Sequence, residues 1–127
     1  PTVVHLVSTV SAQLRSGVSW SEIINATFPP GSVSGAPKFT ALKMINDLEP
    51  TARGPYCGAI GVVDADAVTA KLAVGIRTFW LTGDRGHKVL HFGTGAGITW
   101  GSDPEAEWEE SELKARHLTS VAAGVWT

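Results

Sequence analysis

The sequence is poor in cysteine, in net charge and in long apolar runs. Cys57 is the one cysteine among 127 residues, so an internal disulfide is excluded, and a single thiol fits a reducing compartment. A formal net charge of −2 offers no basic surface for nucleic acid or for an anionic membrane. No apolar run approaches the roughly 20 residues that span a bilayer, and no signal peptide is recognisable. We therefore expect a cytoplasmic protein without nucleic-acid or membrane partners.

The remaining composition is typical of one small globular domain. Of the residues, 43% are hydrophobic and 17% are charged, and the length is enough to build a core. The chain opens at "PTVVHLVSTV", without an initiator methionine and already in a strand-like pattern. We interpret residues 1–127 as a partial domain, a piece of a longer protein.

Local patterns predict a mixture of strands and helices. Ser19 and Glu22 form a capping-box signature ahead of a short helix. β-branched residues and turn signals favour strands over 2–13, over two runs on either side of "DADA" (64–67), and over 87–93. Further helices are expected over 36–50 and 103–122. Without a regular βαβ alternation, this order predicts an α+β fold.

The last predicted helix begins with five glutamates within positions 105–112. At about 100° per residue, Glu107, Glu110 and Lys114 share the face of Leu118 and Val121. Inward carboxylates one turn apart are costly unless a cation compensates them. An all-oxygen site favours Mg²⁺ or Mn²⁺ over zinc, and any third ligand must lie elsewhere. The alternative is that both glutamates are solvated at the start of the helix.

Three segments have the composition of anion-binding sites. "GSVSGAPK" (31–38) is a small flexible loop ahead of a helix, without the Walker A spacing. In "AKLAVGIRTFW" (70–80), strand alternation places Arg77 on one face with Ala73 and Gly75, which leaves room for a carboxylate. "GTGAG" (93–97) offers bare backbone N–H groups. Each also has a structural interpretation: a turn with a solvated Lys38, a surface arginine, and an ordinary glycine-rich connection.

Taken in order, the motifs closely resemble the C-terminal part of the chorismate-utilising enzymes. This family includes anthranilate synthase component I, aminodeoxychorismate synthase component I, and the isochorismate and salicylate synthases. The resemblance covers nearly the whole chain, and it rests on "HLVSTV", "FPPGSVSGAPK", "ALKMINDLEPTARGPYCGAIG", "AVGIRT" and "GAGI…SDPEAEWEES…KA". It implies the C-terminal half of the chorismate-binding fold, an α/β sandwich with the active site between its central sheets.

The resemblance also implies site residues. Glu107 and Glu110 match the metal pair of the family, which binds chorismate with Mg²⁺. His5 and Tyr56, which on sequence alone are more often packing residues, match an active-site histidine and a substrate-binding tyrosine. Arg77 matches a second group that holds the pyruvyl carboxylate. The remaining substrate-binding matches are Ser34, Gly35, Gly95, Ala96, Gly97 and Lys114.

"GSVSGAPKFTAL" and "RGPYCGAIGVVD" favour aminodeoxychorismate synthase within the family, since anthranilate synthases more often carry threonine where Ser32 stands. The expected reaction is Mg²⁺-dependent amination of chorismate to 4-amino-4-deoxychorismate for folate synthesis, with ammonia from a glutamine amidotransferase. The alternatives are anthranilate synthase component I, an isochorismate- or salicylate-synthase-type enzyme, and a non-catalytic binding domain. Intact site residues argue against the last. We expect the isolated chain to have no synthase activity and to self-associate.

Overall fold

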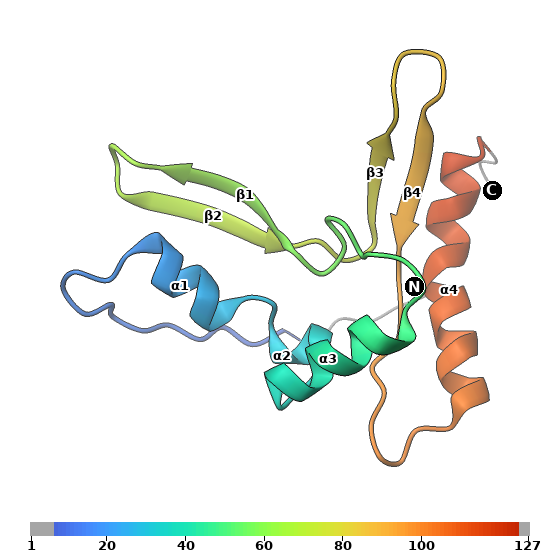
Figure 1. The fold of residues 1–127 in the computed structure, drawn as a ribbon, viewed down its shortest axis with the longest axis horizontal. Helices are drawn as coiled ribbons and strands as arrows, with labels where there is room; N and C mark the ends of the chain where they lie inside the picture. Colours follow the sequence, from blue (N-terminus) through green and yellow to red (C-terminus); the bar gives the residue numbers. More distant parts are fainter. Residues whose placement is uncertain (1–6, 125–127) are drawn as a thin grey trace.

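The computed structural model describes residues 7–124 of the chain. Short helices come first, two β-hairpins follow, and a long helix comes last (Figure 1). The elements are α1 (Trp20–Thr27), α2 (Gly31–Ser34), α3 (Lys38–Leu48), β1 (Ala59–Asp64), β2 (Thr69–Val74), β3 (Thr78–Thr82), β4 (Val89–Gly93) and α4 (Pro104–Ala122).

Helix α1 begins at the predicted capping box. The Ser19 hydroxyl accepts a hydrogen bond from the Glu22 amide at 3.3 Å, and the Glu22 carboxylate accepts one from the Ser19 amide at 2.8 Å. At the other end, the Lys38 ammonium donates to the carbonyls of Asn25, Ala26 and Phe28 at 3.3, 3.4 and 3.1 Å. Lys38 is therefore not a solvated lysine, because it ties the first residue of α3 to the C-terminus of α1.

The predicted hairpin around "DADA" is confirmed. Strands β1 and β2 pair antiparallel from Ala59↔Val74 to Asp64↔Thr69. The Asp64 carboxylate accepts hydrogen bonds from the amides of Asp66 and Ala67 at 3.0 and 2.9 Å, which is how aspartate stabilises a tight turn.

The prediction of one continuous strand over 70–80 is wrong. β2 ends at Val74, and β3 begins at Thr78 and pairs with β4 in a second antiparallel sheet. Gly75 continues the pairing with the β1 side by one position, since its amide donates to the Gly58 carbonyl at 2.9 Å and its carbonyl accepts from the Cys57 amide at 2.8 Å. The strand ends after it, because Arg77 has a left-handed backbone with φ of 48°. A Cβ at this glycine would lie 2.5 Å from the Pro55 carbonyl oxygen, so no other residue fits without a shift.

The strand predicted over 2–13 is also not seen where it can be checked. Residues 7–13 have no regular structure, and none of the four described strands pairs with them. A strand needs a partner for its backbone groups, and composition alone does not supply one. Residues 2–6, including His5, lie outside the described part of the chain.

Helix α4 has the two faces that the sequence predicts. Asp103 caps it by accepting from the Ala106 amide at 2.9 Å. Lys114 and Leu118 are half-buried, and Glu107 and Val121 are as well, whereas Glu110 remains exposed. The opposite face is exposed at Glu105, Glu109, Glu112 and Arg116.

The elements make little contact with one another. Within residues 7–124, close backbone contact between elements is confined to the two hairpins and to α2 with α3. Cys57, 5% exposed, is the one buried apolar side chain among these residues, and Ser34, 7% exposed, is the buried polar one. No helix in this part of the chain is long and apolar enough to cross a membrane. The mixture of helices with antiparallel strands matches the predicted α+β class.

Candidate functional site

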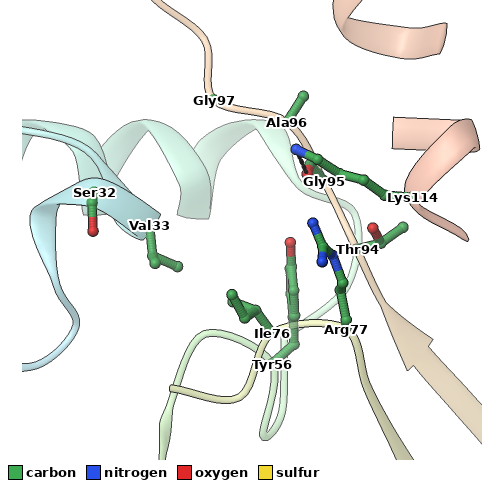
Figure 2. A pocket seen from close by; sticks show the side chains of 10 residues that line it. All are labelled: Ser32, Val33, Tyr56, Ile76, Arg77, Thr94, Gly95, Ala96, Gly97 and Lys114. Atoms are coloured by element: carbon green, nitrogen blue, oxygen red, sulfur yellow. Dashed lines mark hydrogen bonds between the residues drawn. The ribbon is translucent and has the colours of Figure 1, made fainter. Parts of the chain in front are cut away.

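A cavity of about 180 Å³ lies where α2, the loop before β1, the β2–β3 connection, the segment after β4 and α4 meet (Figure 2). Six predicted site residues line it although they come from four separate segments of the sequence: Tyr56, Arg77, Gly95, Ala96, Gly97 and Lys114. Chain folding therefore brings together most of the groups that the sequence singled out as anion ligands.

Tyr56 is fixed by a tight turn and directs its hydroxyl into this cavity. The turn is closed by a hydrogen bond from the Tyr56 amide to the Arg53 carbonyl at 3.1 Å. Burial, followed by the adjacent Cys57 thiol, raises the pKa of the Tyr56 phenol to about 12. The hydroxyl is therefore protonated at neutral pH and is available as a hydrogen-bond donor.

Arg77 lies in the β2–β3 connection with φ of 48°, not on a strand as predicted. Its half-buried side chain nevertheless reaches the cavity, and Figure 2 shows the guanidinium pointing into it, as the Tyr56 hydroxyl does. A left-handed backbone is unfavourable for a non-glycine residue, so the surrounding structure must hold it there.

Lys114 contributes the second cation. Its ammonium donates to the Gly95 carbonyl at 3.3 Å and forms an ion pair with Glu110 one turn earlier in α4. The Lys114 side chain is 19% exposed, whereas that of Glu110 is 50% exposed, so the cation lies deeper than its partner. Two cations, a phenol donor and the glycine backbone of 95–97 make this cavity suited to a small molecule that carries carboxylates.

The candidate metal residues lie beside this cavity and not in it. Glu107 borders an adjoining hollow of about 270 Å³ with Ala96 and Trp108, and it accepts a hydrogen bond from the Ser102 hydroxyl at 2.5 Å. Glu110 lies one turn further along the same face. Both offer carboxylate oxygen, which suits Mg²⁺. Within the described residues, no group of three or more His, Cys, Asp or Glu side chains could hold a metal ion, so this donor set is partial.

Ser34 and Gly35 do not line the cavity. Ser34 is buried at the end of α2, and Gly35 follows it with φ of 100°. Both border a neighbouring hollow of about 520 Å³, which shares Ser32, Val33, Ala96 and Gly97 with the cavity. The preceding residues of the loop, Ser32 and Val33, line the cavity in their place.

Residue-by-residue reasoning missed four lining residues: Ser32, Val33, Ile76 and Thr94. Thr94 is the most informative because its hydroxyl oxygen is buried and has no hydrogen-bond partner among residues 7–124. The sequence signal for Thr94 was its position between the two glycines of "GTG". A polar side chain between two residues without side chains has free space around it.

Comparison of the sequence with known proteins identifies its family. The sequence profile of chorismate binding enzymes matches residues 1–120. The chain is 44% identical over 118 residues to anthranilate synthase component 1 of Synechocystis, covering 91% of this chain and 23% of that protein. It is 42% identical over 123 residues to anthranilate synthase component 1 of Saccharolobus solfataricus, covering 97% and 28%. A Neisseria meningitidis protein of the same name is 40% identical over 120 residues, covering 94% and 23%.

The chain thus spans about a quarter of the length of these curated relatives. Their shared name overturns the prediction of an aminodeoxychorismate synthase and favours anthranilate synthase component I, which was an alternative. The prediction rested on the motifs around Ser32 and Tyr56, and the first of these has a physical weakness. Serine and threonine present the same hydroxyl and differ by one methyl group, so this position discriminates weakly. With a match over 120 of its 127 residues, the chain belongs to the family of chorismate binding enzymes.

Proposed function

We propose that the chain contributes part of the active site of an anthranilate synthase component I. The proposed reaction adds ammonia at C2 of chorismate and eliminates pyruvate to give anthranilate. The observation that carries the proposal is the cavity in which Tyr56, Arg77, Lys114 and the Gly95 backbone converge. Chorismate carries two carboxylates, and this is the chemistry that these groups recognise.

Each lining group has a distinct part in this proposal. The Arg77 guanidinium and the protonated Tyr56 hydroxyl hold the pyruvyl carboxylate in this proposal, because both line the cavity and can donate hydrogen bonds to an anion. The N–H groups of Gly95–Gly97 approach a substrate carboxylate closely, since two of these three residues have no side chain. Lys114 fixes the Gly95 carbonyl and adds positive charge at the rim.

Glu107 and Glu110 would hold Mg²⁺ together with a ligand outside the described residues. When bound, the ion would neutralise the substrate carboxylate and help organise loss of the C4 hydroxyl. Ser102 keeps the Glu107 carboxylate oriented through its 2.5 Å hydrogen bond. For the nitrogen source we propose ammonia from a glutamine amidotransferase partner. His5 remains a predicted active-site histidine, assigned to orienting the ring or assisting proton transfer.

The test uses the full-length protein with chorismate, Mg²⁺ and ammonium, with products identified by mass. Anthranilate formed without any added enzyme is the expected result. A product that becomes p-aminobenzoate only after addition of aminodeoxychorismate lyase would refute the proposal, and Mg²⁺-dependent chorismate binding without turnover would favour a non-catalytic role.

Two substitutions link that reaction to the cavity. Arg77→Gln should lower kcat/KM by roughly a hundredfold, because a charged hydrogen bond to the substrate is lost. The matched control is Arg85→Gln, in the exposed β3–β4 turn, which should change little. Equal losses in both variants would contradict the assignment of Arg77.

A further inference from the structure

Two residues that do not line the cavity, Arg53 and Gly93, lie beside the Tyr56 ring. The Arg53 guanidinium carbon lies over the Tyr56 ring, 5.6 Å from the ring centroid. The ring also presses on the end of β4: a Cβ at Gly93 would lie 2.4 Å from two ring carbons of Tyr56. No side chain other than hydrogen fits at position 93 while the ring stays where it is.

Arg53 is itself held in a fixed geometry. Its Nε donates to both carboxylate oxygens of Glu49, at 3.1 and 2.9 Å, and its Nη2 donates to one of them at 2.5 Å. Its Nη1 donates to the Cys57 sulfur at 3.4 Å. Glu49 directly follows the last residue of α3 and caps that helix. The guanidinium is therefore oriented by a fork of hydrogen bonds that begins at the end of α3.

Neither Glu49 nor Arg53 lines the substrate cavity. Both border a groove that Tyr56, Trp80 and His91 also line, and the hollow of about 520 Å³ that adjoins the cavity. Arg53 contacts a group of the cavity itself at the Tyr56 ring. The Tyr56 hydroxyl lies close enough to the Gly95 backbone that a Cβ there would approach it to 3.0 Å.

We propose that Arg53, oriented by Glu49, is a positioning residue that sets the angle of the Tyr56 ring and so aims its hydroxyl at the substrate carboxylate. This rests on the proposed function for the nature of the ligand, but the geometric claim concerns the ring alone. A guanidinium over an aromatic face attracts it through the ring quadrupole, and the absence of a side chain at Gly93 gives the ring the space that it occupies.

A double-mutant cycle in the full-length protein tests the proposal. The variants are R53M, Y56F, R53M/Y56F and the control R85M in the exposed β3–β4 turn. R53M should raise the KM for chorismate roughly tenfold, with a smaller change in kcat, because a hydrogen bond to a charged group is misaligned. Adding R53M to Y56F should raise KM no further, since the hydroxyl that Arg53 aims is already gone. R53K keeps the charge without the fork, so it should restore part of the loss.

A second readout does not depend on the substrate. With 3-fluorotyrosine incorporated, the ¹⁹F resonance of Tyr56 is the one that Y56F removes. R53M should shift or broaden that resonance, and E49Q, which weakens the fork and leaves Arg53 in place, should do so to a smaller extent. R85M should leave it unchanged.

The outcomes separate the two proposals. An unchanged Tyr56 resonance in both R53M and E49Q overturns the positioning role, and so do KM losses that add in the double variant. A purely structural role for Arg53 predicts lower thermal stability with KM and the resonance unaltered. A wild-type protein that makes no anthranilate refutes the proposed function, and the resonance then decides the positioning role by itself.

Discussion

The isolated 127-residue chain should self-associate in solution. Its solvent-accessible surface is 10530 Å², whereas a folded monomer of 13.4 kDa is expected to expose roughly 6,500 Å². The excess, about 4,000 Å², is several times the ~800 Å² that one partner contributes to a standard interface. Large apolar side chains account for part of it, since Phe39 is 91% exposed and Trp100 is fully exposed. Exposed apolar surface of this extent favours association with other molecules.

Size-exclusion chromatography with light scattering measures this directly. The expected mass lies above 13.4 kDa and rises with concentration, and the chain forms no anthranilate from chorismate and ammonium. A double variant, F39S/W100S, should shift the association to higher concentration because it removes two exposed apolar side chains. R85S in an exposed turn is the control. A mass of 13.4 kDa at every concentration, together with one cooperative unfolding transition, would refute the reasoning.

Three further predictions concern the full-length protein. Lys38→Met should lower the free energy of unfolding by about 1 kcal/mol, because three carbonyls of the α1 C-terminus lose their donor; in denaturant titration, Lys43→Met on the same helix should differ by much less. Thr94→Val should leave thermal stability within about 0.5 kcal/mol, because its hydroxyl bonds nothing among residues 7–124, yet weaken chorismate binding in calorimetry several-fold. The pKa of Tyr56 is raised to about 12, so folding favours the protonated phenol, and its contribution to stability is full below pH 10 and is lost between pH 10 and about 12. The difference between the alkaline absorbance titrations of wild type and Y56F tests this. A tyrosine that titrates near pH 10 would contradict it.

Features decided by neighbouring residues were predictable from the sequence. The capping box at Ser19 depends on two residues three apart, and the turn at Asp64 depends on one carboxylate and the next amides. The face of α4 that carries Glu107 and Lys114 follows from helical periodicity alone. In each case the interaction that stabilises the element lies within a few positions of it.

Features decided by distant residues were not. Alternation predicts one strand through Gly75, but the backbone breaks at Arg77, where φ is 48°, and β3 then pairs with the distant β4 instead of with β1. The pattern over 7–13 is strand-like, but no described strand pairs with it. Lys38 looked solvated because its partners are carbonyls on another helix. A one-dimensional pattern identifies what a segment prefers and not which partner it meets.

The same distinction explains why the family was predictable and the reaction branch was not. Every chorismate enzyme must bind the carboxylates of one substrate, so groups suited to that task, such as those we propose at Tyr56, Arg77 and the backbone of 95–97, indicate the family. Choice of branch depends on which ring carbon ammonia attacks and on whether pyruvate leaves. In the proposed site the cavity residues bind carboxylates, and a hydroxyl at Ser32 is common to serine and threonine. Residues that bind the carboxylates, which every branch must bind, carry little information about the ring carbon at which the substrate reacts.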